Sequence, residues 1–239
     1  MVNAFVHIIE SPSDQDLLDG RTEGRSLCEA LRLANIPGWY SLATTRRTFQ
    51  DCLNNRLIEA HDHFGKTRMP ILHLSMHGNR QGVALTDNTF IGWEELKRCL
   101  QPLNNALQGG LLICLSACFS VSGIRMAMFE GNDHPFWGLV GHPDSAEWAD
   151  AALAYTTFYH RLFKGANVDE AVIAMHAASG DARFMWFRGH DLKNDWVKDR
   201  EEERKRQLSQ GLGSLDAGTF AELLRNLPRA DNPLNPSRT

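Results

Sequence analysis

A cysteine and a histidine each follow closely on an apolar run of the sequence. Cys118 comes after residues 110–116, and His77 comes directly after residues 70–76. A thiolate is a strong nucleophile, and an imidazole beside it can accept the thiol proton and later return it to a leaving group. This pair therefore predicts nucleophilic catalysis by Cys118 with His77 as its general base.

The residue after His77 is a glycine, which suits the same chemistry. A tetrahedral oxyanion is stabilised by backbone N–H groups that point at it. Gly78 has no Cβ, so its backbone can approach a substrate closely. We expect the N–H groups of Gly78 and Cys118 to form the oxyanion hole.

The positions of the other histidines do not favour a catalytic role as that of His77 does. His73 lies four positions before His77, on the same face of a predicted strand but not at its end. His61 and His63 flank an aspartate, but residues two apart do not share a helix face, which argues against a metal site. We expect neither a metal nor another cofactor.

The elements around these residues alternate between short apolar runs and amphipathic stretches, which is typical of an α/β protein with a mostly parallel sheet. The predicted strands are 4–9, 39–43, 70–76, 110–116, 136–141 and 182–188, with a hairpin over 82–91. The predicted helices are 25–35, 48–64, 93–100, 145–163 and 168–178. Ligands bind outside the carboxyl ends of such strands, so His77 and Cys118 would face one crevice if their strands are neighbours.

Composition narrows the classes of function. The chain has 239 residues, 43% of them hydrophobic, with a net charge of −4 and a pI near 6.2, which does not favour a nucleic-acid partner. No apolar stretch approaches the roughly 18 residues of a membrane span, so we expect no membrane partner. Five cysteines without a CxxC pair argue against a disulfide framework, and the start of the chain lacks a secretory leader. A cytoplasmic protein is the expectation.

The character of the sequence changes near its end. Residues 190–210 are dense in charges of both signs, and residues 211–239 are rich in Gly, Ser, Asn and Pro. Too few large apolar residues remain there for a second core. We therefore predict one domain over 1–189 and a charged, helical and partly flexible appendage over 190–239.

The motif Leu115-Ser116-Ala117-Cys118-x-Ser120, after a hydrophobic strand, resembles the nucleophile motif of CHAT domains, which are caspase-like peptidases. The histidine motif Ser75-Met76-His77-Gly78 precedes it, and Cys118 follows His77 by 41 residues. The caspase histidine lies about 50 residues upstream of its cysteine. The resemblance extends in order over residues 68–180 and more loosely over 4–64.

This resemblance implies a caspase-like α/β/α sandwich with about six strands and a small β-hairpin. It also implies a cysteine endopeptidase that cleaves protein or peptide substrates through a thioester acyl-enzyme. Many bacterial relatives resemble effectors in defence or cell death, and caspase-like enzymes are commonly inactive until an activating protein partner, a ligand or a cleavage event rearranges the loops of the active site. That context makes this chain a regulated effector protease by analogy.

The departures from the family concern specificity. The caspase motif Gln-Ala-Cys-x-Gly is absent, so an Asp preference is not implied. Ser116 stands where metacaspase-like relatives have an acidic residue that binds a basic side chain. Asp144 or Asp87 could instead line the specificity pocket, although both also suit ordinary loop roles.

Two alternatives stay open at this stage. The chain could be a catalytically silent, caspase-like binding module with a blocked pocket. It could also be a flavodoxin-like or nucleotide-binding domain. Neither GxxxxGK[ST] nor GxGxxG occurs in the sequence, which weakens the second alternative.

Overall fold

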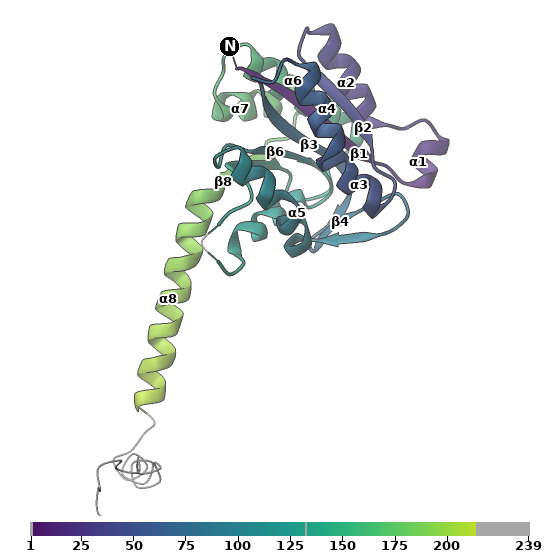
Figure 1. Ribbon diagram of the computed structural model, residues 1–239. Helices are drawn as coiled ribbons and strands as arrows, with labels where there is room; N and C mark the ends of the chain where they lie inside the picture. The colour runs from purple at the N-terminus through teal and green to yellow at the C-terminus, as the bar shows by residue number, and fades with distance from the viewer. Residues whose placement is uncertain (1, 132, 214–239) are drawn as a thin grey trace, which may run out of the picture. The chain divides into compact units, whose positions relative to one another are not determined.

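The computed structural model describes residues 2–131 and 133–213 (Figure 1). The chain divides into two compact units, Met1–Asn194 and Asp195–Thr239. The predicted boundary at 189/190 lies a few residues before this division. Residues 214–239, the last part of the predicted appendage, lie outside the described residues.

A mixed sheet forms the centre of the first unit. Its main path has the order β2-β1-β3-β6-β7-β8. The strands of this path are β1 (Ala4–Ser11), β2 (Gly38–Leu42), β3 (Met69–Asn79), β6 (Leu112–Ser116), β7 (Gly138–Gly141) and β8 (Met185–Arg188). Each neighbouring pair is parallel except β7 and β8, which are antiparallel. Strands β4 (Gly82–Ala84) and β5 (Phe90–Gly92) form a hairpin beside the end of β3.

Helices cover both faces of this sheet, so the unit is an α/β/α sandwich as predicted (Figure 1). On one face lie α2 (Glu23–Leu33), α6 (Trp148–Phe163) and α7 (Val168–Ser179). On the other lie α3 (Arg46–Leu53), α4 (Asn55–His63), α5 (Trp93–Ala106) and the 3-10 helix η1 (Ser120–Met128). Two further helices are α1 (Asp14–Leu18) and α8 (Gly189–Gly213).

The alternation of side chains along each strand explains how one sheet packs against helices on both of its faces. Successive side chains of a strand point to opposite faces. Ile71 of β3 and Cys114 of β6 are buried against α2 and α6, whereas Leu72 and Ile113 are buried with the residues of α3 and α5. Both central strands are apolar on both faces, which is why their sequences read as nearly continuous hydrophobic runs.

Three local features differ from the predictions. The predicted helix 48–64 is two helices, because the backbone of Asn54 leaves helical geometry at φ −112° and ψ −90°. Between the first predicted strand and the first predicted helix, where no element was predicted, lies α1, whose capping box is formed by Ser13 and Asp16. The residues after Cys118 form η1, for which no helix was predicted.

The second unit is described as far as residue 213. Here α8 carries charged side chains with ion pairs at helical spacing, between Lys198 and Asp195 and between Arg206 and Glu202. Within residues 2–131 and 133–213, no helix is both long enough and apolar enough to cross a membrane.

Candidate functional site

The register between β3 and β6 brings the two predicted motifs together. The last registered pair of these parallel strands is Ser75 opposite Ser116. His77 and Cys118 each lie two residues farther along. Because side chains alternate, His77 shares the face of Ser75, toward α2 and α6. The condition that the two strands be neighbours is therefore met.

Close backbone packing at Gly78 fixes the same arrangement. A Cβ atom on Gly78 would lie 3.0 Å from the carbonyl oxygen of Cys118 and 3.2 Å from the Cβ of Ala117. Only a residue without a side chain leaves room for this approach. The turn that carries Cys118 thus rests on the strand end that carries His77.

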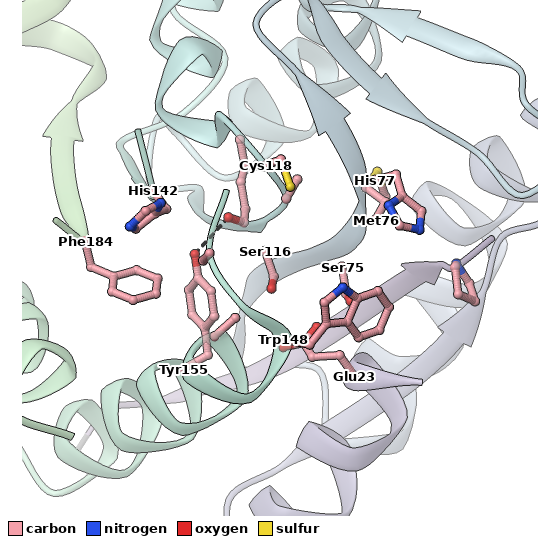
Figure 2. Close-up of a pocket in the computed structure, with 15 residues that line it drawn as sticks. Glu23, Ser75, Met76, His77, Ser116, Cys118, His142, Trp148, Tyr155 and Phe184 are labelled. Carbon is pink, nitrogen blue, oxygen red and sulfur yellow. Dashed lines mark hydrogen bonds between the residues drawn. The ribbon is translucent and has the colours of Figure 1, made fainter. Parts of the chain in front are cut away.

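A pocket opens at this edge of the sheet (Figure 2). It holds about 540 Å³ of empty space, part of it open to solvent. Its lining is mainly apolar and aromatic, with His77, Cys118 and a few hydroxyl and carboxyl groups. The lining residues are Pro12, Glu23, Ser75, Met76, His77, Leu115, Ser116, Ala117, Cys118, His142, Ala146, Trp148, Ala151, Tyr155 and Phe184.

His77 is held by an aspartate that the sequence analysis did not identify. The Nε2 atom of His77 lies 2.8 Å from Oδ2 of Asp16, whose side chain is 10% exposed against 45% for His77. Burial alone would raise the pKa of Asp16, but hydrogen bonds from Ser13 and His77 outweigh it and the pKa is lowered. Asp16 is therefore an ionised acceptor, and Nε2–H of His77 donates to it.

This hydrogen bond determines which atom of His77 can act as a base. With the proton on Nε2, the Nδ1 atom of the neutral ring keeps its lone pair. Among the described residues, Cys118 and His77 form no hydrogen bond with each other. Catalytic hydrogen bonds are often formed only once a ligand is bound, so this geometry is compatible with a dyad. The ring of Trp148 lies beside His77, with centroids 6.0 Å apart.

The five cysteines are all free thiols, but they differ in surroundings. Burial raises the pKa of the thiols of Cys28 and Cys99, that of Cys52 to about 11 and that of Cys114 to about 12. Cys118 is half-buried and is the cysteine that lines the pocket.

The turn after Cys118 is anchored to the end of β7. Phe119 adopts the left-handed conformation at φ 57°, and its N–H donates to the carbonyl oxygen of Asp144 at 3.0 Å. Ser120 is fully buried, and its hydroxyl accepts a hydrogen bond from the N–H of His142 at 2.9 Å. Together with the packing at Gly78, these contacts hold the backbone of Cys118 between the ends of β3 and β7, the two strands that flank β6.

The three predicted specificity residues differ in their position relative to the pocket. Ser116 lines the pocket. Asp144 is exposed and its side chain pairs with Arg183 at 3.1 Å, outside the pocket lining. Asp87 is also exposed, and its carboxylate accepts the N–H of Thr89 within its own turn.

An acidic side chain that does line the pocket is Glu23. Its role could not be predicted from the sequence, because an acidic residue in the first turn of a helix is ordinary. Asp16 was missed because its helix has only five residues within a polar segment. The Ser13 to Asp16 spacing of a capping box was the available signal.

Comparisons with known proteins do not support the predicted family. No model of a known protein family matches the chain, and no curated protein matches it. A similar solved structure is the pyridoxal kinase from Staphylococcus aureus in complex with AMP-PCP, with 10% identity and a TM-score of 0.38 over 80% of this chain and 95% of that chain.

The prediction of a CHAT or caspase-like peptidase is therefore corrected. The structural neighbour is a kinase rather than a cysteine peptidase, and no family match links the chain to CHAT domains. We do not retain the cysteine endopeptidase activity or the effector role in defence or cell death, both of which rested on that resemblance. At this TM-score the kinase's activity is not transferred to this chain either.

Proposed function

We propose that the protein is a thiol-dependent acyl-transfer enzyme for small, activated acyl compounds such as esters or thioesters. Cys118 is the nucleophile, His77 is the base through Nδ1, and Asp16 holds His77 in that tautomer. The observation that carries this proposal is the packing of the Cys118 turn against Gly78, which joins thiol and imidazole in one pocket.

The reaction has two steps, acylation of Cys118 and then transfer of the acyl group to an acceptor. The Cys118 thiol passes its proton to Nδ1 of His77 and its sulfur attacks the acyl carbon, which forms the C–S bond. The bond from the acyl carbon to the leaving oxygen or sulfur then breaks, and His77 returns the proton to the leaving group. Water, an alcohol or an amine next attacks the thioester and releases the Cys118 thiol. The N–H groups of Gly78 and Cys118 are the proposed oxyanion donors.

The lining of the pocket supports a small-molecule substrate. Small-molecule sites combine an apolar lining with a few polar groups, as this pocket does. Five unpaired thiols favour a reducing compartment, and we place the protein in the cytoplasm on that basis.

Intact-mass spectrometry after incubation with a panel of p-nitrophenyl esters and acyl thioesters tests the proposal. We expect an acyl adduct on Cys118 in the wild-type chain and none in Cys118→Ser. Acylation should slow about 100-fold in His77→Gln, because a general base contributes about that factor. Cys99→Ser is the matched control and should acylate normally. Equal acylation of wild type and His77→Gln, or no adduct with any member of the panel, would refute the assignment.

A further inference from the structure

The carboxylate of Glu23 is buried in the pocket without a hydrogen-bond partner. Its side chain is 4% exposed, and neither Oε1 nor Oε2 accepts a hydrogen bond within the described residues. No described Lys or Arg forms an ion pair with it. A buried carboxylate that lacks both hydrogen bonds and a counter-charge is strongly unfavourable. The site therefore lacks a positively charged donor.

The backbone N–H groups at the start of α2, beside Glu23, already donate hydrogen bonds to another acidic residue. The N–H groups of Gly24 and Arg25 donate to the carboxylate of Glu10 at 2.7 and 3.2 Å, and the hydroxyl of Tyr40 donates to it at 2.8 Å. Burial raises the pKa of Glu10, and the nearby charge of Glu23 acts in the same direction. Glu23 is thus not needed as a cap, and it forms no hydrogen bond with Glu10.

The nearest basic group is a histidine that does not complete the site. Nε2 of His73 lies 3.8 Å from Oε1 of Glu23. This separation is too long for a hydrogen bond, and the nitrogen has no other partner among the described residues. His73 is fully buried, and its Nδ1 is taken by the hydroxyl of Tyr159 at 3.0 Å. Nε2 of His73 and both carboxylate oxygens of Glu23 are therefore the atoms here that have no hydrogen-bond partner among the described residues.

We propose that this pocket recognises a positively charged nitrogen group of its ligand, an ammonium, amidinium or guanidinium, through the carboxylate of Glu23. Such a group supplies both the missing charge and N–H donors in a geometry that suits a carboxylate. The hydroxyls of Ser75 and Ser116 also line the pocket and can accept further N–H groups.

The rest of the pocket fits a cation carried on an apolar ligand. Tyr155 and Trp148 line the same space, and aromatic faces attract a desolvated cation. Figure 2 draws Ser75 and Ser116 between Glu23 and the pair of His77 and Cys118. The charge then lies deep in the pocket while the reacting acyl carbon lies at the sulfur.

This inference rests on the proposed function for the identity of the ligand as an acyl compound, but its test does not need the thiol. Binding is measured in Cys118→Ser, which has no thiol to acylate. Loss of acylation at Cys118 with charge-selective binding retained would remove the proposed function alone. Acylation at Cys118 without charge selectivity would remove this inference alone.

Isothermal titration of benzamidine and benzamide, which have nearly the same shape and differ in charge, provides the test. We expect benzamidine to bind Cys118→Ser about tenfold more tightly than benzamide, the size of effect that a charged hydrogen bond gives. Agmatine, an aliphatic guanidine, is the second cation, in case a ring does not fit.

Variants assign the effect to Glu23. In the Cys118→Ser background, Glu23→Gln should abolish the preference, because the amide keeps the shape and removes the charge. Glu29→Gln, on an exposed part of the same helix, should keep it. Equal binding of benzamidine and benzamide, failure of both cations to bind, or a preference that survives Glu23→Gln overturns the inference. The comparison of the two ligands stays decisive if Glu23→Gln does not fold.

Discussion

Gly78→Ala perturbs the candidate site without removing any reactive group. A Cβ atom at this position would lie 3.0 Å from the carbonyl oxygen of Cys118, whereas ordinary van der Waals contact begins at 3.4 Å. The obstacle is backbone, which cannot rotate away as a side-chain tip can. We therefore expect the Cys118 turn to move by a few tenths of an ångström.

The size of the effect follows from that displacement. Overpacking of this kind costs about 1–3 kcal/mol of unfolding free energy, or several degrees in melting temperature for a chain of this length. A misplacement of about 1 Å between catalytic groups costs about 100-fold in rate. A shift of less than half that size should lower the reactivity of Cys118 about tenfold.

Two measurements check the prediction. Urea unfolding gives the change in free energy, and the rate of iodoacetamide labelling at Cys118, followed by peptide mass spectrometry, gives the change in reactivity. Gly92→Ala is the control, because the nearest atom to a Cβ there is the carbonyl oxygen of Gln81 at 3.8 Å. Wild-type stability together with wild-type labelling in Gly78→Ala would show that the two strand ends are not packed as described.

Three further predictions concern the surroundings of the pocket. Asp16→Asn should slow iodoacetamide labelling of Cys118 about tenfold or more at pH 7, because the amide no longer selects the His77 tautomer, while Asp14→Asn should not. Because the folded-state pKa of Asp16 is lowered, its stabilisation is full above the ordinary value near 4 and is lost as the pH falls through the folded value. The stability difference between wild type and Asp16→Asn should therefore shrink below about pH 4, and a difference that grows there would contradict this assignment. The buried hydroxyl of Tyr155 donates to the carbonyl oxygen of Leu115 at 2.8 Å. Tyr155→Phe removes this hydrogen bond and should lower the unfolding free energy in urea titrations by about 1–2 kcal/mol.

Much of the fold could be predicted because its central strands carry a strong signal. The runs that became β3 and β6 are apolar on both faces, which marks buried parallel strands whatever their tertiary context. The hairpin of β4 and β5 was also predictable, from the polar turn between two short apolar segments. The break at Asn54 was not, because the helical spacing of apolar residues continues through it.

The site could be predicted only in part. His77 and Cys118 follow apolar runs, so their place at a sheet edge could be read from the chain. Asp16 and Glu23 could not be recognised, because their significance comes from tertiary contacts with His77 and with the pocket. The family resemblance rested on two short motifs and on the order of the elements over residues 68–180, and no family model supports it.

The pairing of Ser75 with Ser116 has a consequence for how this chain can vary in length. Insertion of one residue between Leu112 and Cys118 would turn the thiol to the opposite face of the sheet, even if the strand itself persisted. Insertion of two residues would restore the face but move the thiol about 6.6 Å along the strand relative to His77. Loops such as the one between α6 and α7 carry no such constraint. Related chains that share this chemistry should therefore keep the lengths of these two strands, whereas such loops can vary in length.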